Sequence, residues 1–204
     1  LYQKANIQIT GFEKADLPDS FFDVVIGNVP FGDYSVVDPQ YNRLHFKIHD
    51  YFFAKSIDKL RTGGIIAFIT TSGTLDKKSE EVRKYINARC DFIGAVRLPD
   101  STFKSAGTKA MADIIFLQKR DRILEQDASW LHTTQTEDGL SLNSYFAEHP
   151  EMVCGTLKTV SGPYGPTLTC EAFADKPLAD VLKEVMSHLH AEFHFQDIEL
   201  QESG

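Results

Sequence analysis

A side-chain amide, a proline and an aromatic ring stand close together in Asn28-Val29-Pro30-Phe31, and this spacing suits a flat, amide-like substrate. The Asn28 side-chain oxygen and the Pro30 carbonyl can both accept hydrogen bonds from one exocyclic amine, while the Phe31 ring stacks on the attached heterocycle. Proline suits such a turn because it fixes φ at about −65° and has no N–H of its own. We predict that Asn28, Pro30 and Phe31 form a catalytic turn; an ordinary Pro turn with a core Phe is the alternative.

The element that must position this turn is the run at residues 21–26, which is rich in β-branched and aromatic residues and is followed by Gly27. This pattern predicts a buried parallel strand. Open α/β sheets bind ligands at the carboxyl ends of their parallel strands, so the strand would present Asn28 at a binding edge. Asp23 lies inside the run, and we expect it to orient backbone rather than to catalyse.

Asn28-Val29-Pro30-Phe31 resembles the Asn-Pro-Pro-Phe/Tyr motif of amino-methyltransferases, and residues 22–28 resemble the Phe-Asp-x-Ile-x-x-Asn lead-in of that family. Val29 departs from the usual Pro, at the position whose side chain is least involved in the contacts. In that family the Asn side chain and the Pro carbonyl hold the target nitrogen toward S-adenosylmethionine, and the aromatic stacks on a flipped base. The resemblance implies an α/β fold, the C-terminal part of a Rossmann-like class I methyltransferase sheet with parallel strands and an antiparallel last hairpin.

Two further runs carry the same resemblance. Residues 60–70 read Leu-Arg-Thr-Gly-Gly-Ile-Ile-Ala-Phe-Ile-Thr, similar to a helix end and the fifth strand of DNA-adenine methyltransferases. We expect an amphipathic helix over residues 44–60, a turn at residues 61–64 and then that strand. Residues 97–117 resemble the sixth-strand, seventh-strand hairpin of the same enzymes, and this implies that Phe103 packs on the flipped base opposite Phe31.

Polar side chains flank these motifs. Thr70, Thr71 and Ser72 follow the predicted fifth strand and could line the base pocket, or form only a hydroxyl-rich turn. Lys104 and Lys109 stand beside Phe103 and suit phosphate contacts, although exposed lysines also simply solvate a loop.

Few residues of the sequence are candidates for binding the cofactor. Residues 5–13 alternate in strand fashion up to Gly11, like the third strand of class I methyltransferases, after which an acidic residue sits beside the cofactor adenine. Glu13 or Asp16 would take that place; an exposed turn carboxylate is the alternative for each. The first two strands, with the Gly-rich loop, would lie upstream of Leu1. We therefore expect a fragment that binds S-adenosylmethionine weakly or not at all and is inactive alone, or else a naturally degenerate fold.

The same resemblance predicts an unpaired edge. In the class I fold the fourth strand lies beside the first, so the strand at residues 21–26 would lack one neighbour. Residues 6–10 could fold across that edge, or two copies of the chain could pair there as a homodimer.

The composition of the chain argues against membrane, disulfide-rich and metal-binding classes of protein. The chain has 204 residues, 42% hydrophobic, enough for one core with an appendage. No apolar run approaches the roughly 20 residues of a membrane helix, so we expect a cytoplasmic protein with no membrane partner. Cys90, Cys154 and Cys170 are widely spaced, which favours buried reduced thiols over disulfides or zinc. His45 and His49 have metal-pair spacing on the predicted helix but no evident third ligand, so no metal site is expected.

Charge divides the chain in two. Residues 1–122 hold 18 Lys+Arg and 15 Asp+Glu, whereas residues 123–204 hold 3 and 14. We predict a partial methyltransferase catalytic domain over 1–122, compatible with DNA phosphates, and a turn-rich acidic C-terminal extension over 123–204 with helical periodicity only at residues 178–190. Together with the Gly-Asn-Val-Pro-Phe-Gly form of the motif, the extension resembles methylase–helicase fusion proteins of mobile elements and phages, which implies a helicase domain in the full-length chain.

The leading hypothesis is a fragment of a DNA methyltransferase that methylates the exocyclic N6 of adenine. Its chemistry needs positioned dipoles rather than a base with a strongly shifted pKa. A protein-glutamine or RNA N-methyltransferase, and a non-catalytic assembly module, remain the alternatives.

Overall fold

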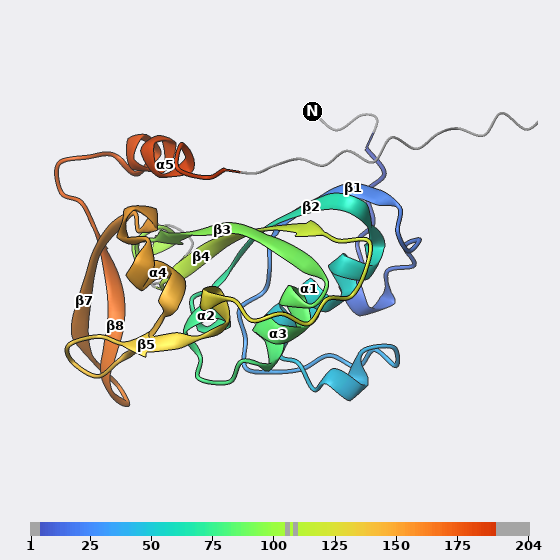
Figure 1. The fold of residues 1–204 in the computed structure, drawn as a ribbon, viewed down its shortest axis with the longest axis horizontal. Coiled ribbons are helices and arrows are strands. Elements are labelled where there is room, and N and C mark those ends of the chain that lie inside the picture. The colour runs from blue at the N-terminus through green and yellow to red at the C-terminus, as the bar shows by residue number, and fades with distance from the viewer. Residues whose placement is uncertain (1–4, 105–106, 108–109, 191–204) are drawn as a thin grey trace, which may run out of the picture.

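The computed structural model describes residues 5–104, 107 and 110–190, and its centre is a mixed sheet in the order β1-β2-β4-β3. The strands are β1 (Phe22–Asn28), β2 (Leu60–Thr71), β3 (Cys90–Leu98) and β4 (Ala112–Lys119). β1 runs parallel to β2, and β4 runs antiparallel to both β2 and β3 (Figure 1). β1, β2 and β3 therefore end at the same side of the sheet. The predicted α/β class, with parallel strands and an antiparallel last hairpin, is confirmed.

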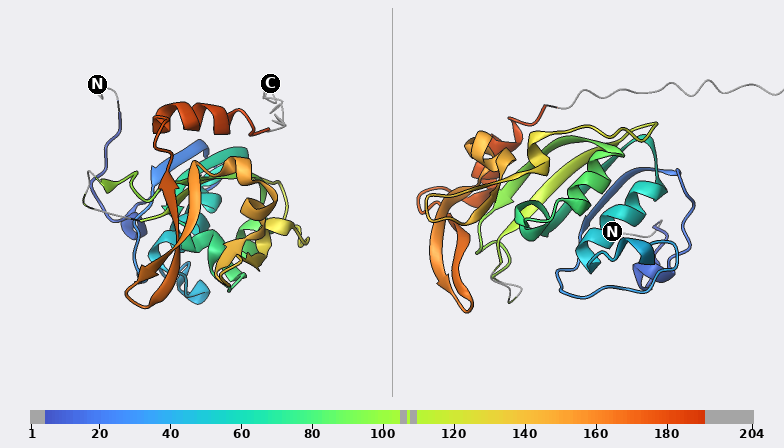
Figure 2. Two further views of the ribbon diagram at one scale, coloured as in Figure 1. Left: turned by 90° about the vertical axis from the view of Figure 1, so that its left-hand side faces the viewer. Right: turned by 60° about the horizontal axis from the view of Figure 1, so that its bottom comes forward.

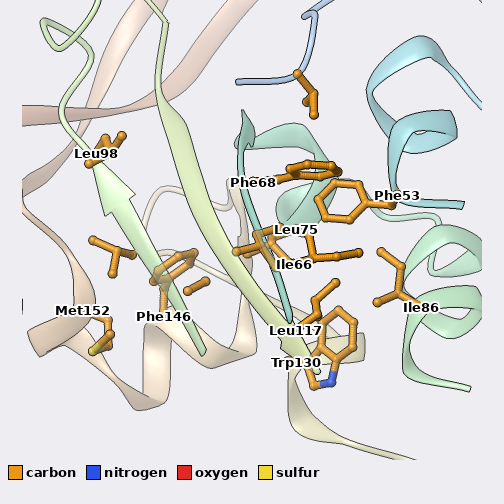
Figure 3. Packing of buried hydrophobic residues seen from close by; sticks show 14 of the residues in the cluster. Phe53, Ile66, Phe68, Leu75, Ile86, Leu98, Leu117, Trp130, Phe146 and Met152 are labelled. Atoms are coloured by element: carbon orange, nitrogen blue, oxygen red, sulfur yellow. The ribbon is translucent and has the colours of Figure 1, made fainter. Parts of the chain in front are cut away.

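Helices α1 (Ile48–Lys59) and α3 (Glu81–Asn87) cover one face of this sheet, while α5 (Leu178–Met186) lies on the other (Figures 1 and 2). Alternate residues of β2 turn toward α1 and α3, and Ile66 and Phe68 are almost fully buried there. Phe53 of α1 meets the Phe68 ring edge-on at 5.2 Å between centroids (Figure 3). Burying each such side chain stabilises the fold by roughly 1.5–3 kcal/mol, so this layer holds β2 firmly in place.

The boundary between α1 and β2 differs from the sequence prediction. Leu44 belongs to a 3-10 turn, η2 (Asn42–Leu44), α1 begins at Ile48, and β2 already begins at Leu60. The turn predicted at residues 61–64 is wrong, because these residues form an irregularity inside β2 in which Gly63 takes a φ of 77°. Glycine tolerates that conformation without a side-chain clash. The prediction that His45 shares a helix with His49 is also wrong, because His45 precedes α1.

The strand predicted at residues 5–11 is wrong as well. Residues 5–10 pair with no strand in the described chain and are exposed, Ile9 almost completely. A strand needs a neighbour for its backbone hydrogen bonds, and alternating sequence does not supply one. A 3-10 turn, η1 (Phe12–Lys14), follows, and Phe12 packs on Phe52 of α1 with ring centroids 4.7 Å apart. Residues 6–10 therefore do not cover β1.

β1 is an edge strand in the described structure, with β2 as its sheet neighbour. The predicted parallel pairing is confirmed, but the predicted burial is wrong: Val24 and Ile26 are 55% and 74% exposed. These side chains lie on the sheet face away from α1, where no described element packs on them. Pairing of two copies through this edge stays a prediction.

The chain beyond residue 122 is more regular than the turn-rich reading predicted. It contains η4 (Ser129–Leu131), β5 (Thr133–Gln135), β6 (Ser141–Asn143), α4 (Ser144–Glu148), η5 (Pro150–Met152), β7 (Gly155–Gly162), β8 (Gly165–Ala172) and α5, which the periodicity predicted. Trp130, Phe146 and Met152 are buried in one core with the sheet (Figure 3), and Phe92 of β3 stacks on Trp130 at 4.5 Å. The hydrophobic core thus runs across residue 122, and the domain division proposed there stays a prediction.

The three cysteines are free and buried, as predicted. Burial raises the pKa of Cys90 and Cys170 to about 12 and that of Cys154 to about 11, so these thiols are poor nucleophiles. No helix within the described residues is long and apolar enough to cross a membrane.

His132 joins the C-terminal extension to the start of α3, with Nδ1 2.8 Å from Glu80 Oε1 and Nε2 2.7 Å from Asp127 Oδ1. Its hydrogen bonds with Glu80 and Asp127 raise the pKa of His132. The protonated ring therefore stabilises the fold below the unfolded pKa of about 6.5, and this contribution is lost as pH rises through the folded pKa. We expect His132→Gln to lower the Tm more at about pH 5.5 than at about pH 8.5 in thermal unfolding.

The matched control for this prediction is the same substitution in a Glu80→Gln background. Without the Glu80 carboxylate, the main cause of the raised pKa is gone, so the pH dependence of the His132→Gln effect should shrink. Equal losses of Tm at both pH values in the parent background would contradict the prediction.

Candidate functional site

The predicted catalytic turn leaves β1 at the end of the sheet, directly beside β2. Asn28 pairs with Ile69 in the parallel register, and the Val29 N–H donates to the Ile69 carbonyl at 3.0 Å. Val29 is buried in the core, whereas Asn28 and Pro30 are exposed and Phe31 is half-exposed. The valine that departs from the family motif therefore anchors the turn, and the three residues with predicted chemistry remain open to a ligand.

The start of α1 holds the chain that follows the turn. The Ile48 N–H donates to the Tyr34 carbonyl at 2.8 Å, and Lys47 pairs with Asp33 at 2.8 Å. The hydrogen bond from Lys47 lowers the pKa of Asp33. The predicted catalytic turn is thus fixed on one side by β2 and on the other by a helix.

The remainder of the polar loop at residues 33–43 is held by Asp38. This buried carboxylate accepts hydrogen bonds from Tyr51 at 2.7 Å and from Lys55 at 3.1 Å, both on α1. His49 lies on the same helix, largely buried, and burial lowers its pKa. Among the described residues, no three His, Cys, Asp or Glu side chains are grouped as a metal site.

The hydroxyl turn after β2 divides into two parts. Thr70 is fully buried and its Oγ1 lies 3.0 Å from Thr74 Oγ1, because an inward-facing strand position places it under the turn. Its substrate contact stays a prediction that this burial does not support. Thr71 and Ser72 are half-exposed. Thr71 Oγ1 accepts a hydrogen bond from the Gly73 N–H at 3.3 Å, and the Ser72 N–H donates to the Met111 carbonyl at 3.2 Å. These bonds fix the turn that carries both hydroxyls, next to the strand that ends at Asn28.

The predicted base-contact turn lies at the same side of the sheet, beyond β4. It follows β3, and Thr102 closes it by donating to the Pro99 carbonyl at 2.7 Å. Phe103 is half-exposed and packs partly against the core, and Lys104 is exposed. Lys109 lies outside the described residues. The structure therefore brings Asn28, Phe31 and Phe103 to one side of the sheet, with β2 and β4 between the two turns.

The predicted cofactor residues lie elsewhere. Glu13 is half-exposed in η1, which packs against α1, and Asp16 is exposed just after it. The reason is that residues 5–10 do not form the third strand that would have carried these carboxylates to the end of the sheet. A contact of Glu13 or Asp16 with cofactor stays a prediction.

A buried ionic network below the turns was missed by the sequence prediction. Arg97 and Asp113 are fully buried and form two hydrogen bonds of 2.9 Å, and Arg97 also pairs with Asp76 at 2.9 Å. Burial lowers the pKa of Arg97, but the charges of Asp113 and Asp76 more than offset this, and the net shift is upward. The sequence signal for this network was a single charged residue, Arg97 or Asp113, in each of two otherwise apolar strand segments.

The network continues into the C-terminal extension through α2 (Gly73–Asp76), the short helix after Ser72. The Asn143 N–H donates to Asp76 Oδ1 at 2.9 Å, and the Asn143 amide donates to the Leu75 carbonyl at 2.9 Å. Arg97 also lies over the Phe146 ring at 4.2 Å. The extension thus fixes the position of the turn that presents Thr71 and Ser72.

Comparison with known proteins finds a family match over about half of the chain. Residues 2–102 match the family model described as Eco57I restriction-modification methylase, and these residues include the Asn28 turn, α1 and β2. Residues 2–102 are therefore similar to methylases of restriction-modification type, in agreement with the resemblance that the motifs showed.

Individual relatives are more distant. The chain is 27% identical over 143 residues to the "Defense against restriction protein B" of Escherichia phage P1, a match over 67% of this chain and 6% of that protein. A class I S-adenosylmethionine-dependent methyltransferase structure from Listeria monocytogenes is 25% identical, covering 52% of this chain and 34% of its own, with a TM-score of 0.41. A type I restriction enzyme modification subunit from Vibrio vulnificus is 17% identical, covering 83% and 40%, with a TM-score of 0.42. The chain thus spans a small part of these proteins.

Proposed function

We propose that this chain is the amine-binding part of a DNA methyltransferase that acts on the exocyclic N6 of adenine. The observation that carries the proposal is the exposed turn Asn28-Val29-Pro30-Phe31 at the end of β1, anchored by the buried Val29 and by its hydrogen bond to β2. The turn presents two acceptors and one aromatic face, which match a nucleobase amine.

In this proposal the residues of the chain hold and orient the target base and exchange no proton with it. The Asn28 side-chain oxygen and the Pro30 carbonyl accept hydrogen bonds from the two N–H groups of the amine. These hydrogen bonds withdraw the nitrogen lone pair from the ring and direct the lone pair outward. Phe31 stacks on one face of the flipped base, and Phe103 approaches it from the turn after β3, across the ends of β2 and β4. S-adenosylmethionine supplies the methyl group. After transfer the nitrogen carries an extra proton, which is released to solvent.

The donor side is not built by the described residues alone. β1 ends in Asn28-Val29-Pro30-Phe31-Gly32 and β2 ends in Thr71-Ser72-Gly73, and neither turn has the Gly-rich form that cradles a charged cofactor. Glu13 and Asp16 lie beside α1. We therefore assign the acceptor half of the reaction to this chain and expect it to have no methyltransferase activity by itself.

The experiment is methyl transfer from labelled S-adenosylmethionine to adenine-containing duplex DNA by the full-length protein, with nucleoside analysis of the product. N6-methyladenine supports the proposal. Label on protein glutamine or on RNA instead would identify one of the alternative N-methyltransferases. No transfer to any of the three, by a protein that binds cofactor in calorimetric titration, would indicate a non-catalytic assembly module.

Phe31→Ala and Phe103→Ala in the full-length protein are each expected to weaken binding to DNA whose target adenine faces a mismatch or an abasic site. Stacking on an unpaired base contributes roughly 1–3 kcal/mol per ring, or about 5- to 150-fold in Kd. Fluorescence anisotropy with labelled duplexes measures this. Phe21→Ala is the matched control, because Phe21 is 64% exposed and precedes β1 at its other end. Unchanged affinity in both variants would assign the two rings to the core.

A further inference from the structure

The hairpin of β7 and β8 stands across the side of the sheet where β1, β2 and β3 end. The Asp100 N–H donates to the Cys170 carbonyl at 2.9 Å, and Thr169 Oγ1 donates to Asp100 Oδ2 at 3.1 Å. Asp100 follows β3 and opens the turn that carries Phe103. Figures 1 and 2 show the hairpin projecting beyond the sheet at this end. The hairpin is therefore fixed to the proposed base-contact turn.

A cavity of about 300 Å³ separates the hairpin from the turn after β2. Its lining on the sheet side includes Ser72, Lys77 and Met111, and on the hairpin side Thr167 and Leu168. Asp76 also lines it, but its carboxylate is held by Arg97 and Asn143. The surface that begins at Asn28 and continues through Ser72 thus extends across this cavity to the hairpin.

The charge of the hairpin differs from that of the rest of the extension. None of residues 152–170 is Asp or Glu, although residues 123–204 hold 14 acidic residues. Glu171 of β8 is neutralised by its pair with Lys158, whereas Asp138 accepts a hydrogen bond from Thr159 and keeps its negative charge. Carboxylates repel phosphates, whereas Thr and Ser hydroxyls donate to them, so the strands of the hairpin are the part of the extension that best suits a polyanionic partner.

The tip of the hairpin holds a fully exposed aromatic ring. Tyr164 has a relative exposure of 102% in the turn Gly162-Pro163-Tyr164-Gly165. Gly165 takes a φ of 114°, which its lack of a side chain permits in so tight a turn. A two-stranded ribbon of this kind can enter a DNA groove, and an aromatic ring at its tip can stack on a base or pack on a sugar.

We propose that β7 and β8 form the second wall of the DNA-binding surface, and that Tyr164 contacts the duplex beside the target adenine. This inference rests on the proposed function, because the hairpin is assigned to DNA by its place beside the Phe103 and Ser72 turns. It assigns to the C-terminal extension a part in DNA binding despite its net negative charge.

The test uses the full-length protein with Tyr164→Ala and Thr167→Glu, and with Tyr164→Phe as the conservative control. We expect Tyr164→Ala to raise the Kd for target duplex at least about fivefold in fluorescence anisotropy, and Tyr164→Phe to change it little. Thr167→Glu places a carboxylate opposite phosphates, so it should also weaken binding, more so at low salt. Methylation at subsaturating DNA should fall in step with the loss of affinity, because both residues are proposed to act in binding.

A second measurement locates the contact. Duplexes shortened stepwise from each side of the target should lose the Tyr164→Ala effect when the flank under the hairpin is removed, and from one side only. Parent-like Kd values for Tyr164→Ala and Thr167→Glu on long duplexes would overturn the inference while normal methylation leaves the proposed function standing. If the parent binds DNA but methylates no adenine, the proposed function fails and the same Kd values still decide the role of the hairpin. A change in the solution mass of the variants with unchanged DNA affinity would assign the hairpin to a second copy and overturn the inference.

Discussion

Replacing Asn28 with Ala in the full-length protein should abolish methyl transfer to DNA while leaving DNA binding nearly unchanged. The Asn28 side chain is exposed at the end of β1, so its loss opens no cavity in the core. It removes one of the two acceptors that direct the lone pair of the amine, a loss comparable to removing a positioned dipole that stabilises a transition state. Such losses lower the rate by about 100- to 1,000-fold. Single-turnover methylation and anisotropy on one target duplex measure both quantities.

Asn6→Ala is the control for this experiment, because Asn6 is an exposed asparagine outside the proposed site. It should leave rate and affinity at the parent values. A loss of about tenfold or less in Asn28→Ala would remove Asn28 from the mechanism. A parallel loss of DNA affinity would instead show that Asn28 binds the substrate equally in the ground and transition states.

The position of the turn at Asn28-Val29-Pro30-Phe31 could be predicted from the sequence because it is determined locally. A strand pattern ending at Gly27 predicts where β1 ends, and Pro30 restricts the backbone just beyond it. The buried Val29 and its hydrogen bond to Ile69 then hold the turn against β2. The roles of Thr70 and Thr71 were harder to separate, because strand alternation decides which hydroxyl faces the helices and the strand register is a tertiary property.

The hydrophobic pattern of a segment describes what its side chains could pack on and leaves open whether a neighbour is there. For that reason the pattern of residues 21–26 predicted burial, yet Val24 and Ile26 are exposed on an edge strand. Residues 5–10 alternate as a strand and pair with no strand in the described chain. The hairpin carried the opposite error: Thr residues interspersed with Leu, Val and Cys stand on both sides of Gly162-Pro163-Tyr164-Gly165, a signal for β7 and β8 that the high turn content obscured.

The buried network could not be located from the sequence, because it depends on which strands are adjacent. Arg97 and Asp113 are far apart in the chain and face each other only through the antiparallel pairing of β3 and β4. Asp76 and Asn143 join them from α2 and from the end of β6. The pairing accounts for both buried charges, since burying either charge without its partner would cost too much desolvation free energy.

Asp113→Asn should destabilise the chain strongly, by about 3 kcal/mol in the free energy of unfolding. The substitution keeps the shape of the side chain but leaves the buried Arg97 guanidinium with Asp76 as its remaining ionic partner. That second partner places the expected loss at the lower end of the range for a broken buried ion pair. Urea-induced unfolding, followed by Trp130 fluorescence because Trp130 is buried in the same core, measures the change.

Asp91→Asn is the matched control, because Asp91 pairs with Arg120 at 2.6 Å on the surface and its side chain is 58% exposed. Water screens this pair, so its loss should cost at most about 1 kcal/mol. Equal effects of the two substitutions would show that the buried pair contributes no more than a surface pair. If Asp113→Asn has the larger effect, the same variant in the full-length protein should also slow methylation, because Asp76 ties the network to α2 and so to the Thr71-Ser72 turn beside Asn28.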